Sequence, residues 1–222
     1  MGLVSLLLLA LFIFVLGNLL FIPVWVAAWS LAAALTAPAQ FLAVATNKRL
    51  RRNHALEHAT INVLEERFGP HRLAGLARED GFIIKGWGDP KAIRLAAEEG
   101  LARLKRGEKD LAVHDRCGTS WASANFVTAV VFLVLLFGLG RFSLANVILV
   151  MLLANLGGPV LGRLFQRYVT TSTDVEDLFI TGFECQAAHL GWGRLLVNPA
   201  LAGIPVVCHI RTATLLFYED AA

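Results

Sequence analysis

Residues 3–46 read LVSLLLLALFIFVLGNLLFIPVWVAAWSLAAALTAPAQFLAVAT, and no Asp, Glu, Lys or Arg occurs before Lys48. A helix needs about 20 apolar residues to cross the hydrocarbon core of a bilayer, so this stretch is long enough to cross twice. Gly17 and Pro23 weaken a helix and predict a break between them. The expected helices cover 3–20 and 23–46. A cleaved signal peptide is the alternative, but the N-terminus lacks the basic residue that such a peptide carries.

Two further runs, 117–140 and 142–162, also contain no Asp, Glu, Lys or Arg. They predict membrane-spanning helices at 121–139 and 143–162, joined by a short turn. The sequence therefore predicts an α-helical integral membrane protein with about four transmembrane helices and a small cytoplasmic α/β insert. The spans carry no charged side chain of the kind that relays protons or ions, which argues against a transporter.

The distribution of basic residues predicts the orientation. Of the 20 Lys and Arg residues, 15 lie in 48–118. The positive-inside rule then places this segment and the C-terminus in the cytoplasm, in a multi-pass protein of the cell membrane whose partner is the lipid bilayer. A net charge of +3 is too small to indicate a nucleic-acid partner; the oligomeric state is not predicted. The expected parts are a transmembrane hairpin (1–47), a cytoplasmic metal-site insert (48–118), a second transmembrane hairpin (119–162) and a cytoplasmic or membrane-surface C-terminal region (163–222).

Local patterns predict the elements outside the spans. Apolar spacing and the terminating Gly69-Pro70 indicate a helix, and a short run bounded by glycines indicates a strand. Asp89-Pro90 starts a second helix, and Asp174 caps a third. The expected elements are a helix at 53–68, a strand at 81–86, a helix at 90–106, a loop at 108–120 and a helix at 175–189. Three cysteines, an odd number on the cytoplasmic side, argue against a disulfide framework.

The strongest chemical signal is His54-Ala55-Leu56-Glu57-His58. Residues three and four apart share one face of a helix, so both imidazoles and the carboxylate can reach a common point. Two His at i and i+4 form a metal-binding pair, and H-x-x-E-H is the inverted zincin motif. Glu57 is then the candidate general base.

A second motif, His114-Asp115-Arg116-Cys117-Gly118, resembles the short turn of a zinc knuckle with His in place of the first Cys. His54 follows the second expected span and Cys117 precedes the third, so the two motifs can meet at one membrane surface. We therefore predict a shared zinc site made by His54, His58, His114 and Cys117. The alternative is that the imidazoles only hydrogen-bond near the helix and that Cys117 is a buried apolar residue.

A weaker cluster lies towards the C-terminus. Cys185 and His189 are four apart on the expected helix, next to Glu184, and Cys208-His209 follow. A Cys and a His packed in an amphipathic helix explain this spacing better than a second metal site does.

Three motifs carry a resemblance to a known family: His54-x-x-Glu57-His58-x-x-Ile61-Asn62, His114-x-x-Cys117-Gly118-Thr119-Ser120 and Gln166-x-x-x-Thr170-Thr171. Over about residues 50 to 185 the chain resembles the YqhQ-like bacterial membrane proteins, which are uncharacterised and regarded as metal-dependent enzymes of the inner membrane. The resemblance implies metal binding by His54, His58, His114 and Cys117, and an acid role for Glu57. Asp115 stands where a proline is expected, and the insert between the two metal-binding halves is longer.

Two functions follow from these residues. The first is a membrane-embedded, metal-dependent hydrolase at the cytoplasmic bilayer surface, acting on a lipid, a lipid-linked compound or a membrane protein. Here three ligands hold zinc and leave one position open for water. The second is a non-enzymatic membrane scaffold, in which all four ligands bind and the zinc is structural. No Walker loop, Rossmann glycine pattern or G-x-S-x-G motif is present.

Overall fold

The computed structural model describes residues 2–70, 73–118, 144–187 and 204–215, with 122, 126, 127, 129–131, 133 and 134. The chain divides into two compact units, one made of 1–40 and 121–161 and the other of 41–120 and 162–222. Most of the span predicted at 121–139, its turn to the next span, and His189 lie outside the described residues.

The N-terminal stretch forms one helix, not two. Helix α1, Leu3–Thr46, runs for 44 residues through Gly17 and Pro23 without the predicted break. Helix α5, Leu144–Phe165, covers the last predicted span and contains Pro159.

The predicted four-span integral membrane protein, and with it a multi-pass location in the cell membrane, is wrong. In the part of the chain that the structure describes, no helix combines the length and the apolar character that a membrane crossing requires. Basic residues at the start of the 48–118 segment bind protein groups. Arg51 Nη2 donates to the carbonyls of Tyr168 and Thr171, at 3.2 and 3.0 Å. Buried Arg52 forms ion pairs with Asp174 and Asp177.

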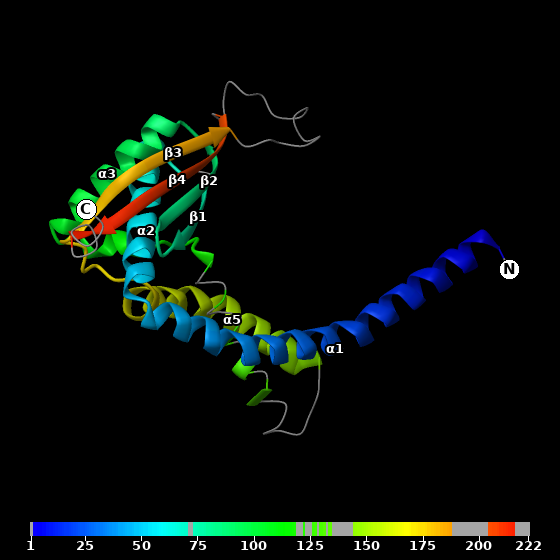
Figure 1. The fold of residues 1–222 in the computed structure, drawn as a ribbon. Coiled ribbons are helices and arrows are strands. Elements are labelled where there is room, and N and C mark those ends of the chain that lie inside the picture. The colour runs from blue at the N-terminus through cyan, green and yellow to red at the C-terminus, as the bar shows by residue number, and fades with distance from the viewer. Residues whose placement is uncertain are drawn as a thin grey trace. The chain divides into compact units, whose positions relative to one another are not determined.

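The second unit is built on a four-stranded antiparallel sheet with the order β1-β2-β4-β3 (Figure 1). The strands are β1 Leu73–Arg78, β2 Gly81–Gly88, β3 Leu178–Ala187 and β4 Ile204–Thr214. The strand predicted at 81–86 is confirmed as β2, whereas the helix predicted at 175–189 is wrong because β3 occupies most of it. Alternate side chains of β4 are buried, including Val206, Cys208 and Ile210, which is the period of a strand with one face in a core.

Two helices cover the buried face of this sheet. Helix α2, Lys48–Phe68, is capped by Asn47 and ends at Gly69; helix α3, Pro90–Lys105, is capped by Asp89. Both confirm helices predicted from the sequence. Their apolar faces form the core together with β2 and β4, through Leu56, Ala59, Ile93, Ala97, Phe82, Ile84 and Ile210.

Two short helical turns complete this unit. The turn η1, Lys109–Ala112, is a 3-10 helix, and η2, Gln166–Thr170, is a π-helix at the end of α5. The η1 turn precedes Cys117, and the η2 turn precedes Thr171. Each turn contacts α2 through the carbonyl of its last residue.

A disulfide joins Cys185 of β3 to Cys208 of β4. The two residues face each other across the β3–β4 pair. The expectation that the cysteines form no disulfide is therefore wrong, because the strand register, which the sequence pattern did not reveal, brings these two together. Cys117, which is buried, forms no disulfide within the part of the chain that the structure describes.

Candidate metal centre

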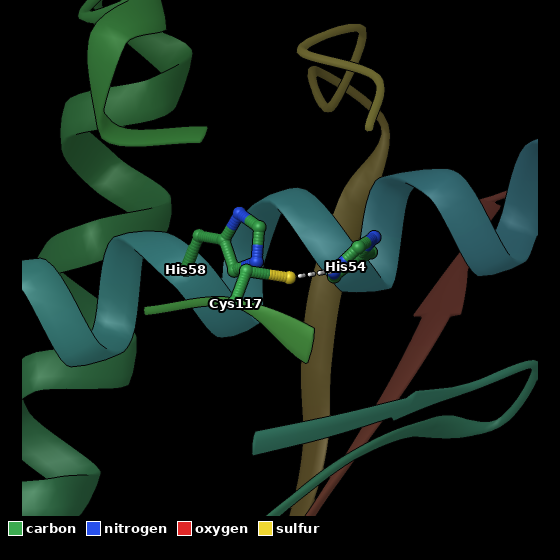
Figure 2. A group of neighbouring side chains, drawn as sticks. All are labelled: His54, His58 and Cys117. Atoms are coloured by element: carbon green, nitrogen blue, oxygen red, sulfur yellow. Dashed lines mark hydrogen bonds between the residues drawn. The ribbon is translucent and has the colours of Figure 1, made fainter. Parts of the chain in front are cut away.

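Helix α2 presents His54 and His58 one turn apart on the same face, which is the i, i+4 arrangement expected from the sequence. Their ring centroids are 4.3 Å apart, and both side chains are buried. Cys117 arrives from a different segment, at the end of a turn closed by its own N–H and the carbonyl of His114. Figure 2 shows the three side chains converging, and one donor atom from each lies within 4.8 Å of the others. The group could therefore hold a metal ion.

Backbone carbonyls fix the orientation of both imidazoles. His54 Nδ1 lies 2.9 Å from the carbonyl of Thr170, and His58 Nδ1 lies 2.7 Å from that of Ala112. A carbonyl only accepts, so each neutral ring carries its proton on Nδ1 and leaves the Nε2 lone pair exposed to the centre. Metal-binding imidazoles are usually held in this way by their second nitrogen.

The two Nε2 atoms differ in what they meet. His54 Nε2 lies 3.4 Å from Cys117 Sγ. With tetrahedral angles and ordinary bond lengths to zinc, an imidazole nitrogen and a thiolate lie about 3.5 Å apart. His58 is 1% exposed, and its Nε2 has no hydrogen-bond partner among the described groups. A buried polar atom without a partner lowers the stability of the fold, and a bound ligand at this nitrogen would remove that penalty.

The electrostatics keep His58 neutral. Burial, followed by the charge of His54, lowers the pKa of His58 to about 3, against the opposing effect of Glu57. For His54, burial lowers the pKa, but the Cys117 hydrogen bond and the charges of Glu57 and Cys117 together raise it above the usual value. The imidazole of His58 therefore has its lone pair available at neutral pH.

Glu57 lies beside the three donors but is held by the sheet. Its carboxylate is buried and accepts a hydrogen bond from the Ala77 N–H of β1. A Cβ at Gly75 would overlap this carboxylate, so the missing side chain makes the space that Glu57 fills. Burial raises the pKa of Glu57, and the neighbouring His58 and His54 partly offset this effect.

His114, which the sequence places in the ligand set, is not part of the converging group. Its Nε2 lies 3.4 Å from Glu65 Oε2, and its ring centroid lies 6.1 Å from that of His58. The backbone of His114 is instead held by Gln166, whose side chain binds both its N–H and its carbonyl.

Several residues that build the site are not evident from the sequence pattern. The carbonyls of Thr170 and Ala112 have no sequence signature, and Gly75 is marked only by its lack of a side chain. Gln166 is part of the third motif, which is the signal that could have assigned it.

The second cluster offers no thiol ligand, because Cys185 and Cys208 are joined in the disulfide. Of the neighbouring polar residues, His209 Nε2 lies 3.6 Å from Asp80 Oδ2, and Glu184 forms an ion pair with Arg211 at 3.1 Å.

Comparison with known proteins places the site within a family region. The family model described as "Domain of unknown function (DUF6391)" matches residues 49–183, which include the three donors and Glu57. An uncharacterized protein of Picosynechococcus sp. (strain ATCC 27264 / PCC 7002 / PR-6) is 35% identical over 89 residues, which is 36% of this chain and 43% of that protein. The chain therefore spans less than half the length of this curated relative. No solved structure matches. Because the family model covers more than half of the sequence, the chain belongs to the DUF6391 family.

Proposed function

We propose that this protein is a metal-dependent hydrolase in which His54, His58 and Cys117 bind a zinc ion and Glu57 is the general base. The observation that carries the proposal is the buried, unpartnered Nε2 of His58, directed at the same point as the imidazole of His54 and the thiol of Cys117. Two imidazoles and one thiolate form a donor set that suits zinc.

A thiol nucleophile activated by His54 is the competing chemistry, since His54 Nε2 and Cys117 Sγ are 3.4 Å apart. Such a pair uses one imidazole and leaves His58 Nε2 without a partner in the described structure. A metal ion gives a role to all three donor atoms. The metal centre is therefore the better explanation of the geometry.

Three protein ligands favour catalysis over a purely structural role. Zinc in structural sites usually has four protein ligands, whereas catalytic zinc keeps a fourth position open for water, which it activates. His114 would be the fourth ligand of a structural site, but its Nε2 is directed to Glu65. Among the described residues, the converging group offers no fourth donor for the scaffold function predicted as the alternative.

Glu57 has the properties of a general base for attack on a carbonyl or phosphoryl centre. Its raised pKa brings the carboxylate closer to the range in which it accepts a proton efficiently. The Ala77 N–H and the space at Gly75 hold the carboxylate beside the donors without making it a ligand.

Metal analysis of the chain tests the binding step. After chelator treatment, zinc titration should give one ion per chain, and His58→Ala and Cys117→Ser should each lose it. His114→Ala is the matched control and should still bind zinc. Loss of zinc in His114→Ala to the same extent would instead support the four-ligand scaffold.

Ester hydrolysis tests the chemical step. The zinc-loaded protein should hydrolyse p-nitrophenyl acetate, and Glu57→Gln should bind zinc normally while its rate falls about 100-fold or more. An equal rate for Glu57→Gln and the wild type would contradict the role of Glu57. Full activity of His58→Ala would point to the thiol nucleophile.

A further inference from the structure

Gln166 grips the backbone of His114 with both ends of its side-chain amide. The His114 N–H donates to Gln166 Oε1 at 2.8 Å, and Gln166 Nε2 donates to the His114 carbonyl at 3.1 Å. Gln166 is fully buried, so these bonds do not compete with water. We propose that Gln166 is a positioning residue of the metal centre, which sets the place of the Cys117 thiol without touching the metal.

The path from Gln166 to the thiol is short. The His114 carbonyl that Gln166 binds also accepts the Cys117 N–H, at 3.3 Å, and this bond closes the turn that carries the thiol. Asn62 of α2 holds the preceding residues, because its Nδ2 donates to the carbonyls of Leu111 and Val113 at 3.0 and 2.9 Å. The segment is thus fixed to α2 on one side and to η2 on the other.

The π-helical turn η2 connects Gln166 with a second donor. The Gln166 carbonyl accepts the Thr171 N–H at 3.0 Å, which is the wide i to i+5 bond of a π-helix. Within this turn, the Gln166 side chain reaches the Cys117 segment while the Thr170 carbonyl holds Nδ1 of His54. The third donor, His58, is held by the carbonyl of Ala112, in the segment that Asn62 and Gln166 fix in place. One irregular turn therefore helps to orient all three donors.

This inference rests on the proposed metal binding, and cobalt(II) is a probe that separates the two. A thiolate bound to cobalt gives a charge-transfer absorption in the near ultraviolet, and the visible bands report the coordination geometry. Gln166→Met keeps the side-chain volume and removes both hydrogen bonds to His114. We expect its cobalt dissociation constant to rise about 10- to 100-fold and the charge-transfer absorption per bound cobalt to fall.

Thr171→Val is the matched control. Thr171 is buried and its Oγ1 donates to the Gln166 carbonyl at 2.7 Å, so the variant loses a buried hydrogen bond of the same turn but leaves the grip on His114 intact. Its cobalt spectrum should equal that of the wild type. Gln166→Glu keeps an oxygen that accepts the His114 N–H and should recover part of the affinity, which also provides a second variant if Gln166→Met does not fold.

The outcomes are distinct. A wild-type cobalt affinity and spectrum in Gln166→Met would overturn the role of Gln166 alone. If Gln166→Met does not fold, the same result in Gln166→Glu would overturn it. Equal losses in Thr171→Val and Gln166→Met would also overturn it, because the effect would then be general destabilisation. Failure of the wild-type chain to bind cobalt or zinc would overturn the proposed function itself.

Discussion

Glu57 and the donor residues differ in what holds them. The imidazoles of His54 and His58 are fixed by carbonyls at Nδ1, whereas the Glu57 carboxylate is fixed by an N–H group of β1. A carboxylate that accepts a hydrogen bond from the sheet is positioned but keeps further lone pairs for a proton. In the proposed mechanism, metal binding and proton transfer are therefore assigned to different side chains, each held by its own backbone partner.

Gly75→Ala tests this separation without changing any polar group. The new methyl group would occupy the space of the Glu57 carboxylate, so we expect the carboxylate to shift and the hydrolysis of p-nitrophenyl acetate to fall about 100-fold. Zinc content should stay at the wild-type value. Leu76→Ala, on the exposed neighbour in the same strand, is the control. Loss of zinc in Gly75→Ala would show that Glu57 belongs to the ligand set.

The ion pairs of Asp174 predict a pH effect on stability. Lys48 and Arg52 lower the pKa of the Asp174 carboxyl. A carboxyl whose folded-state pKa is depressed stabilises the fold above its unfolded pKa, near 4, and this contribution is lost as the pH falls through the folded-state value. Asp174→Asn should therefore lower the melting temperature at pH 6, with a difference from the wild type that shrinks below pH 4. Identical melting temperatures across this range would show that the ion pairs contribute nothing.

At the scale of elements, the close packing of α2 against α3 depends on Gly100. A Cβ at this position would lie 3.1 to 3.2 Å from backbone and side-chain atoms of Ala59 and Thr60. Backbone atoms of a buried helix yield little, so Gly100→Val should destabilise the protein by about 1–3 kcal/mol through overpacking. Denaturant unfolding measures this change. Ala102→Val, at an exposed position of α3, should cost less than 1 kcal/mol; an equal cost for both would refute the packing argument.

The elements that could be predicted from sequence are those with local signals. Gly69 ends α2, Asp89-Pro90 begins α3, and glycines flank the core of β2, whereas the start of α2 at Lys48 lies before the predicted start at Asn53. The strand β3 could not be assigned in this way, because its pairing with β4 links residues far apart in the chain. Strand propensity depends on such neighbours more than helix propensity does.

The candidate site shows the same division. The spacing of His54 and His58 is a property of one helix and is visible in the sequence. The approach of Cys117 depends on how η1 and its following turn pack against α2. His114 has the right residue type and spacing, but the packing of its turn directs its ring to Glu65. Residue spacing could therefore identify the candidate ligands, but not which of them converge on one point.

At the scale of the whole molecule, the second unit joins two separate pieces of chain, 41–120 and 162–222. The three candidate ligands come from the first piece, while the carbonyl that orients His54 comes from the second. The Cys185–Cys208 disulfide links two strands of the second piece. The candidate metal centre and the disulfide therefore lie in different parts of the second unit.

Removing the disulfide should lower the stability of this unit without removing the metal centre. A cross-link between residues 23 positions apart restricts the unfolded chain and is worth about 3 kcal/mol. The chelator-treated Cys185→Ala/Cys208→Ala variant should lose about this much in denaturant unfolding. The wild type under reducing conditions is the control, since it loses the cross-link but keeps both side chains.

Zinc should still stabilise the disulfide-free variant, because neither cysteine is a candidate ligand. A zinc concentration about 100 times the dissociation constant adds about 2.7 kcal/mol to the free energy of unfolding. We expect this gain in the wild type and in the double variant, and not in His58→Ala. If zinc stabilised His58→Ala as well, or if the double variant gained nothing, the ion would be binding at groups other than the three that converge on α2.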